Sequence, residues 1–502
     1  MKFKLVLLGL LTTIFCFGQI QDLANLADGK IVKSSTLYDS NENLYGYLYI
    51  YERDANESSK TMEYVLLDKN LNKVANKTFQ NKLYNSVSSS YYNCELMGDH
   101  IILCKYYYYK TFFTGEPKAL LTTFQTISLK DNTVSEEYKY DNGQFTPFVA
   151  EFDNMKKEYK SVDSKNIIRG FSNDSFMGFY IVELNKKDYL EKDLKFFNEK
   201  REQIWSYTYN PDGNEFAYQT FFFLTSNKNT IYLCVPKWEK DAYSSLNAKE
   251  FKIVALDLPT GKVKYEYMFE NSTSKFSHTL RAREFDNKLI LTGNYSPYKT
   301  SDFKLDDNLG FYRIVLDEKG KVTDEKYTTW TDFSSFLNIN KKGRVEENYR
   351  LRPTKYFFFK DGSVSILNEK YKYDSFNGYS KLTDFVLVNM KNDFTPGSVN
   401  IIKKDMSYSS SDYLFSQSIK DDTGVVFFYS DAIKNPGGFE VKDVILGINT
   451  IIDGKLTEEK ISLYSKKKYA IEPSPAKEGY IMLHEFNEKA KYNQIRLEKL
   501  NY

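Results

Sequence analysis

Three acidic residues, Asp39, Glu95 and Glu284, lie on or near the predicted first, innermost strands of a repeated unit. A pair of carboxyl groups can hydrolyse a glycosidic bond, one acting as general acid and the other as nucleophile or base. This chemistry requires a fold that brings the two groups together. Because carboxylates are far more often solvated surface groups, catalysis by these residues is the weaker of two interpretations.

A second set of candidate residues is aromatic. The run from Tyr106 to Phe113 contains six aromatic side chains, and Tyr298 and the segment Tyr371 to Tyr373 occupy comparable loops. Aromatic faces present an apolar surface on which a sugar ring can stack, which makes these residues candidates for glycan binding. Tyr residues that alternate along a strand more often pack against a neighbouring sheet, and this second interpretation is preferred.

Metal and nucleotide chemistry is not indicated by the sequence. Its three histidines, His100, His278 and His484, are widely separated, and no HExxH, CxxC or HxxxH spacing occurs. Phosphate-binding and dinucleotide-binding glycine motifs and the GxSxG elbow are also absent. The acidic segment Asp421-Asp422-Thr423-Gly424 is interpreted as a hairpin turn. We therefore expect no metal site and no cofactor.

The elements that would position these residues form a repeated hairpin. An apolar strand, a short cluster of Asp, Asn, Gly or Lys and a second, more polar strand recur roughly every 60 to 70 residues. Gly and Asn tolerate the positive φ of tight turns, and Asp can bind its own backbone. The seven turns of this kind contain Asp68, Asp131, Asn198, Asp257, Asp317, Asn392 and Asp453.

Each repeat contains four strand candidates, and the middle ones are apolar on both faces. Examples are IILC (101–104), LILTG (289–293) and VILGI (444–448). A sheet with one solvated face should alternate strictly, whereas blades packed face to face cover both sides of their middle strands. The sequence therefore predicts an all-β protein with a single β-propeller of four-stranded antiparallel blades over residues 19–502, with eight blades favoured and seven next.

The first seven predicted blades begin near Lys30, Ser88, Lys165, Glu215, Phe276, Tyr356 and Tyr413. Two irregular insertions separate some of them: residues 147–159, where Phe148, Phe152 and Met155 favour a short helix, and residues 331–354. The remaining tail from Tyr469 has only three strand candidates. We expect the segment 19–26 to supply the fourth strand and close the ring.

The first eighteen residues have the features of a signal peptide. Lys2 and Lys4 precede an apolar stretch from Leu5 to Phe15 that is too short to span a bilayer as a mature helix. Cleavage is predicted between Gly18 and Gln19. Acylation of Cys16 is disfavoured by the bulky residue before it, and no second hydrophobic segment has spanning length. We expect an exported protein in the periplasm or outside the cell.

Three cysteines remain after this cleavage. Cys94 and Cys104 flank a turn on adjacent predicted strands, so a local disulfide is geometrically conceivable. Buried free thiols are the preferred interpretation for these two residues and for Cys234. Stability would then not depend on a disulfide framework.

The balance of charge excludes some partners. Lys and Arg total 69 against 67 Asp and Glu, which provides no basic field for nucleic acid. The short run Lys466-Lys467-Lys468 is interpreted as a solvated loop. The oligomeric state stays open.

The leader, the strands rich in Tyr, Lys and Asn, and the hairpin period of about 60 residues resemble secreted propeller-like proteins of unknown function from Bacteroidota-type bacteria. This resemblance implies a fold and a compartment, and it transfers no functional residue. Two functions remain: a non-catalytic binding or scaffold protein of the cell envelope whose propeller face recognises a protein or glycan, and a carbohydrate-active enzyme. An enzyme should show clustered carboxyl groups with shifted pKa values.

Overall fold

The computed structural model describes residues 20–40, 42–111, 115–159, 166–173, 176–183, 193–209, 221–238, 248–269, 276–298, 308–374, 379–408, 411–419, 421–434, 441–465, 467 and 469–501. The predicted signal peptide (1–18) and its cleavage site after Gly18 lie outside the described residues, as do Phe112, Phe113, Lys466 and Lys468.

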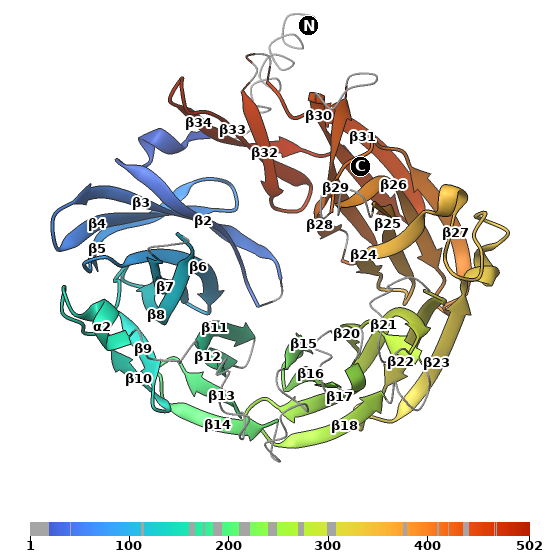
Figure 1. The fold of residues 1–502 in the computed structure, drawn as a ribbon, viewed down its shortest axis with the longest axis horizontal. Helices are drawn as coiled ribbons and strands as arrows, with labels where there is room; N and C mark the ends of the chain where they lie inside the picture. The colour runs from blue at the N-terminus through green and yellow to red at the C-terminus, as the bar shows by residue number, and fades with distance from the viewer. Residues whose placement is uncertain are drawn as a thin grey trace, which may run out of the picture.

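Eight antiparallel sheets stand side by side in a ring (Figure 1). Blade 1 consists of β2 (Lys30–Tyr38), β3 (Leu44–Ala55), β4 (Ser59–Asp68) and β5 (Lys73–Lys82). Blade 2 consists of β6 (Ser88–Met97), β7 (His100–Lys110), β8 (Pro117–Ser128), β9 (Tyr138–Asp141) and β10 (Gln144–Pro147), followed by helix α2 (Met155–Tyr159). Blade 3 consists of β11 (Asn166–Asn173), β12 (Phe176–Glu183), β13 (Asp193–Asn198) and β14 (Gln203–Thr208).

Blade 4 consists of β15 (Phe222–Ser226), β16 (Thr230–Trp238), β17 (Ala248–Asp257) and β18 (Val263–Phe269). Blade 5 has a divided first strand, β19 (Phe276–His278) and β20 (Arg281–Phe285), then β21 (Lys288–Pro297), β22 (Gly310–Leu316) and β23 (Val322–Thr329). The short 3₁₀ helices η4 (Trp330–Phe333) and η5 (Glu346–Asn348) follow it.

Blade 6 consists of β24 (Arg350–Phe358), β25 (Val364–Asp374), β26 (Tyr379–Met390) and β27 (Pro396–Ile402). Blade 7 consists of β28 (Tyr413–Ile419), β29 (Gly424–Lys434), β30 (Val441–Ile452) and β31 (Lys455–Ser462). Blade 8 combines β32 (Ala470–Pro475), β33 (Tyr480–Asn487) and β34 (Tyr492–Lys499) with β1 (Ile20–Asp22) from the other end of the chain, and η2 (Leu23–Asn25) follows β1. The predicted eight-bladed propeller is confirmed.

The middle strands are apolar on both faces because each face packs on a different neighbour. In β4, Tyr64 and Leu66 belong to the hydrophobic core between blades 1 and 2, while Val65 and Leu67 belong to the core between blades 1 and 8. All four side chains are buried. Similar cores lie between the other neighbouring blades, so the apolar surface buried in the ring is continuous.

The predicted hairpin turns are present, and their acidic residue organises them. The Asp68 Oδ1 atom accepts the backbone N–H groups of Asn70 and Asn72, both at 2.8 Å. Leu71 then adopts a φ of +66°, and its side chain is fully buried between blades 1 and 8. A left-handed backbone usually favours glycine, but at Leu71 it directs an apolar side chain into the core.

The ring is closed by the N-terminal segment, as predicted. Within β1, Ile20 pairs with Arg496 and Asp22 pairs with Gln494 of β34. The next residue, Leu23, is 1% exposed, and its carbonyl accepts the Tyr51 hydroxyl at 2.8 Å. The two ends of the chain are thereby fixed to each other through blade 8 (Figure 1).

Three details differ from the sequence predictions. Blade 2 has five strands because β9 and β10 extend it beyond Tyr138. The first strand of blade 6 starts at Arg350, inside the insertion predicted for 331–354, because its first half is polar and contains Pro353. An innermost strand tolerates proline since one of its edges has no partner strand. Helix α2 exists, but it starts only at Met155.

No helix within the described part of the chain has the length and hydropathy needed to cross a bilayer.

Candidate functional site

The three predicted catalytic candidates do not form a cluster. Asp39 lies in the turn after β2, where its Oδ1 atom accepts the backbone N–H of Asn43 at 2.9 Å. The backbone N–H of Asp39 in turn donates to the Asn43 carbonyl. The residue therefore shapes the hairpin between β2 and β3.

Glu95 and Glu284 lie on innermost strands, as predicted, but each binds a neighbouring blade. Glu95 on β6 forms an ion pair of 2.6 Å with Arg169 on β11, and its second oxygen accepts the backbone N–H of Gly170 at 2.9 Å. Glu284 on β20 accepts the Asn227 amide from blade 4 at 3.2 Å. Both carboxylates therefore connect adjacent blades, and neither bonds to the other or to Asp39 in the described structure.

The pKa shifts of the described carboxyl groups do not identify a general acid. A glycosidase needs a general acid whose pKa is raised. Among the described carboxyl groups, those with a shifted pKa are all shifted downward: Asp68, Asp99, Asp131, Asp317, Glu346 and Asp393. For example, the hydroxyl of Thr133 lowers the pKa of Asp131 to about 2, and the ammonium group of Lys370 at 2.6 Å lowers that of Glu346.

The three histidines occupy separate structural positions. The Nδ1 atom of His100 lies 2.6 Å from Asp99, and the Nε2 atom of His484 lies 2.5 Å from the Asn493 amide oxygen. His278 is buried beside Tyr327, and burial lowers its pKa to about 4. No group of three potential metal ligands occurs in the described residues.

Cys94, Cys104 and Cys234 are free, buried thiols. Cys94 packs in the core between blades 1 and 2, whereas Cys104 packs in the core between blades 2 and 3. The two side chains thus lie on opposite faces of one sheet, which explains why no disulfide joins them. The preferred interpretation from sequence is confirmed.

Most of the described aromatic candidates are partly buried, and Tyr107 is fully buried. Tyr107 is 1% exposed and donates its hydroxyl to the Glu137 carboxylate at 2.9 Å. Tyr109 carries the Lys156 ammonium 4.7 Å from its ring centre. Tyr371 lies beneath the Arg352 guanidinium, and Tyr298 is partly buried. Only Tyr373 among these residues is widely open to solvent, at 61% exposure.

The segment 421–424 is a turn, as predicted, and one of its residues also forms an ion pair. Asp421 and Asp422 both have positive φ angles between β28 and β29. The Asp422 carboxylate binds Arg283 of blade 5, and the same guanidinium donates to the Phe358 carbonyl of blade 6 at 3.0 Å. One Arg side chain therefore links three consecutive blades beside the axis.

Sequence reasoning missed a buried ionic cluster between blades 6 and 7. Glu369 on β25 has no exposed surface; it forms an ion pair of 2.6 Å with Arg352 and accepts the backbone N–H of Asp412 at 2.7 Å. The Asp412 side chain in turn binds the buried ammonium of Lys404 at 2.5 Å. The only sequence signal was a Glu directly after the apolar start of a strand, between Asn368 and Lys370. Because every member is neutralised, the cluster fastens the two blades rather than offering a free acid.

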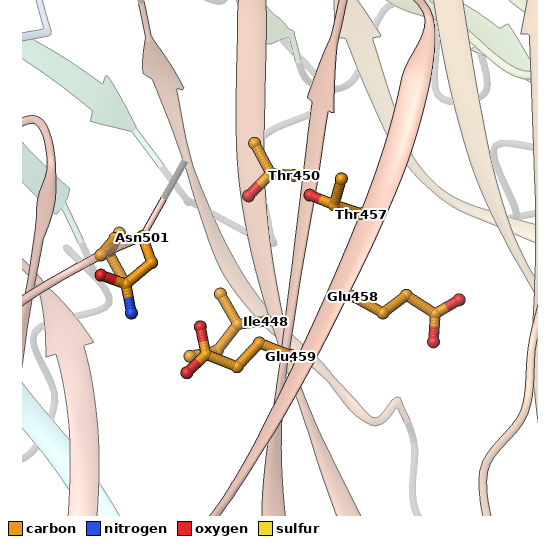
Figure 2. A pocket seen from close by; sticks show the side chains of 7 residues that line it. Ile448, Thr450, Thr457, Glu458, Glu459 and Asn501 are labelled. Atoms are coloured by element: carbon orange, nitrogen blue, oxygen red, sulfur yellow. The ribbon is translucent and has the colours of Figure 1, made fainter.

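A hollow of about 260 Å³ lies at the periphery, between blade 7 and the end of blade 8. It is lined by Ile448, Thr450, Thr457, Glu458, Glu459, Leu500 and Asn501. Figure 2 shows the Glu458 and Glu459 carboxylates directed to opposite sides of β31, as expected for successive strand residues. They do not face each other as a catalytic pair would.

Comparison with known proteins gives one family match and several distantly similar structures. Residues 1–407 match the family described as "Family of unknown function (DUF6770)". No curated protein matches the sequence. Similar solved structures include the WD40 domain of SCAP from fission yeast, at 8% identity and a TM-score of 0.42 over 96% of this chain and 98% of that chain. Polysaccharide lyase Uly1 is 9% identical with a TM-score of 0.42, over 81% and 89% of the two chains.

Proposed function

The chain belongs to the DUF6770 family of unknown function, and we propose that this member is an exported, non-catalytic binding or scaffold protein of the cell envelope. Its propeller face would recognise a protein or a glycan. The main support is the state of Glu95 and Glu284, the two carboxylates placed on innermost strands. Both are occupied by donors from neighbouring blades, so neither is arranged as a free acid or base.

Export is part of this proposal. The support comes from the N-terminal sequence, in which Lys2 and Lys4 precede the apolar stretch up to Phe15. Cleavage after Gly18 would leave the closing strand β1 intact, because β1 starts at Ile20. N-terminal sequencing of the protein recovered from outside the cytoplasm should therefore begin at Gln19. An unprocessed N-terminus, or a lipid attached to Cys16, would contradict this part of the proposal.

The alternative is a carbohydrate-active enzyme. A glycan-array screen followed by a hydrolysis assay on every bound glycan separates the two functions. We expect no hydrolysis of any bound glycan. Release of reducing sugar by the wild-type protein would overturn the non-catalytic proposal, whatever ligand the protein binds.

A further inference from the structure

The innermost strands carry a surplus of positive charge. Strands β2, β6, β11, β15, β19, β20, β24, β28 and β32 together contain eight Lys and Arg but only three Glu. Their surplus of five exceeds that of the whole chain, which is two. The remainder of the molecule is therefore slightly acidic, and positive charge is concentrated around the axis of the ring.

Not all of this charge is neutralised within the protein. Arg169, Arg283 and Arg352 form ion pairs with carboxylates. Arg281 and Lys355 are both exposed and have no ion-pair partner among the described residues. The Arg281 guanidinium donates to the Leu280 carbonyl at 2.9 Å. Two cations on neighbouring innermost strands thus remain available to an anionic partner.

The innermost strands of four consecutive blades each carry an exposed side chain at a comparable sequence position, and in blade 4 the adjacent Phe223 is exposed as well. Phe222, Arg281, Lys355 and Leu414, which we name the axial quartet, lie on β15, β20, β24 and β28. Phe222 is 46% exposed and Leu414 is 40% exposed. Each of the four lies about five to seven residues before the turn that joins the first and second strands of its blade. This spacing is expected when hairpins of similar length stand side by side in a ring. Figure 1 shows β15, β20, β24 and β28 on the inner side of the ring.

Local irregularities accompany the quartet. The register of β28 shifts between Tyr413 and Phe415, so Leu414 is the extra residue of a bulge. The register of β24 shifts between Pro353 and Lys355, directly before the quartet lysine. Bulges redirect individual side chains and are common beside functional sites. Here one of them leaves a large apolar side chain in water instead of burying it in a neighbouring core.

We propose that the axial quartet binds an extended acidic segment of a partner protein whose acidic residues are interspersed with apolar ones. This inference rests on the proposed binding function and names its partner class. In blade order the quartet is apolar, cationic, cationic and apolar. The two cations can bind acidic side chains of such a segment, and the two apolar side chains can contact its apolar residues. Leu414 has neither a polar atom for sugar hydroxyl groups nor an aromatic face on which a sugar ring could stack, so a polypeptide fits this end of the quartet better than a glycan.

The main chain of the innermost strands strengthens this preference. Each innermost strand has a neighbouring strand of its blade on one side only, although Arg344 and Tyr464 form single bridges to β24 and β32 on the other side. Some groups of this other edge are already bound, as the Gly170 N–H is by Glu95 and the Phe358 carbonyl by Arg283, and the rest of the edge has no partner strand among the described residues. Such an edge can bind the main chain of an extended peptide, while side chains add specificity. A polysaccharide offers no comparable regular series of donors and acceptors.

The test uses a fluorescein-labelled peptide of alternating Glu and Leu, titrated with the mature protein by fluorescence anisotropy. The double variant Arg281→Glu/Lys355→Glu should weaken binding about tenfold or more, since two attractions become repulsions. The matched control is Lys77→Glu/Lys326→Glu, which reverses two exposed lysines on the outer strands β5 and β23. This control should leave the affinity within about twofold of wild type.

A second pair of variants tests the apolar half of the quartet. Leu414→Ser should weaken binding, whereas Val74→Ser, at an exposed position of outer strand β5, should not. Equal weakening by both charge-reversal pairs would overturn the inference, as would tight binding of a polyuronate chain without binding of the peptide. If the peptide fails to bind and no glycan is hydrolysed, the inference fails while the proposed function stands.

Discussion

Closure of the ring by the N-terminal segment can be tested at a single side chain, Leu23. This residue is 1% exposed and packs in the core between blades 8 and 1, among Tyr51, Ile495 and Leu497. Leu23→Ala removes buried methyl groups and leaves a cavity, which costs about 2–4 kcal/mol in a well-packed core. Ile20→Ala is the matched control because Ile20 lies on the same segment but is 54% exposed.

The measurement is urea-induced unfolding of the mature protein, followed by circular dichroism. We expect the unfolding midpoint to fall clearly for Leu23→Ala and to change by less than the equivalent of about 0.5 kcal/mol for Ile20→Ala. The slope of the transition should stay constant, which would show that stability has changed and not the extent of unfolding. Equal midpoints for Leu23→Ala and wild type would refute the reasoning, because the segment would then contribute nothing to closure.

Three further predictions concern buried polar groups. Glu369→Gln should lower the free energy of unfolding by about 3 kcal/mol, because it removes the charge that Arg352 and the Asp412 N–H bind. Glu458→Gln on outer strand β31 is the control. Equal urea midpoints for the two variants would contradict the account. Burial lowers the pKa of His278 to about 4. Between this pKa and about 6.5, the unfolded chain binds one proton at His278 that the folded chain does not bind, so stability should fall as the pH drops through this range. His278→Phe should reduce the difference in urea midpoint between pH 7 and about 5, and an unchanged difference would argue against a buried neutral histidine. Burial raises the pKa of Cys94 to about 11 and also raises those of Cys104 and Cys234, so Ellman's reagent should modify these thiols only after unfolding; rapid reaction of the native protein would disprove their burial.

Most of the fold was predictable from the sequence because a propeller repeats its signals. The Asp, Asn and Gly turns recur at one spacing, and middle strands such as Tyr64 to Leu67 are apolar on both faces for the same reason in each blade. The first strand of blade 6 was the main error in strand placement. Arg350, Arg352 and Pro353 look like a loop in isolation, and only their position at the axis makes them compatible with a strand.

The candidate sites were less predictable because they depend on contacts between blades. Sequence placed Glu95 and Glu284 on innermost strands, but it could not show that Arg169 and Asn227 would bind them. Glu369 was missed altogether, since its partners are Arg352 on the adjacent strand β24 and Ser411 and Asp412 in the segment that leads to the next blade. Residues separated by a whole repeat become neighbours only when the ring is assembled.

The account depends most on the role of Glu95 and Glu284 as connections between blades. The most direct measurement is the release of reducing sugars from a panel of polysaccharides by the wild-type protein and by Glu95→Gln/Glu284→Gln, with the folding of each checked by thermal unfolding. We predict that neither protein hydrolyses any polysaccharide and that the double variant unfolds at a lower temperature. Hydrolysis by the wild type that disappears in a fully folded double variant would contradict the account.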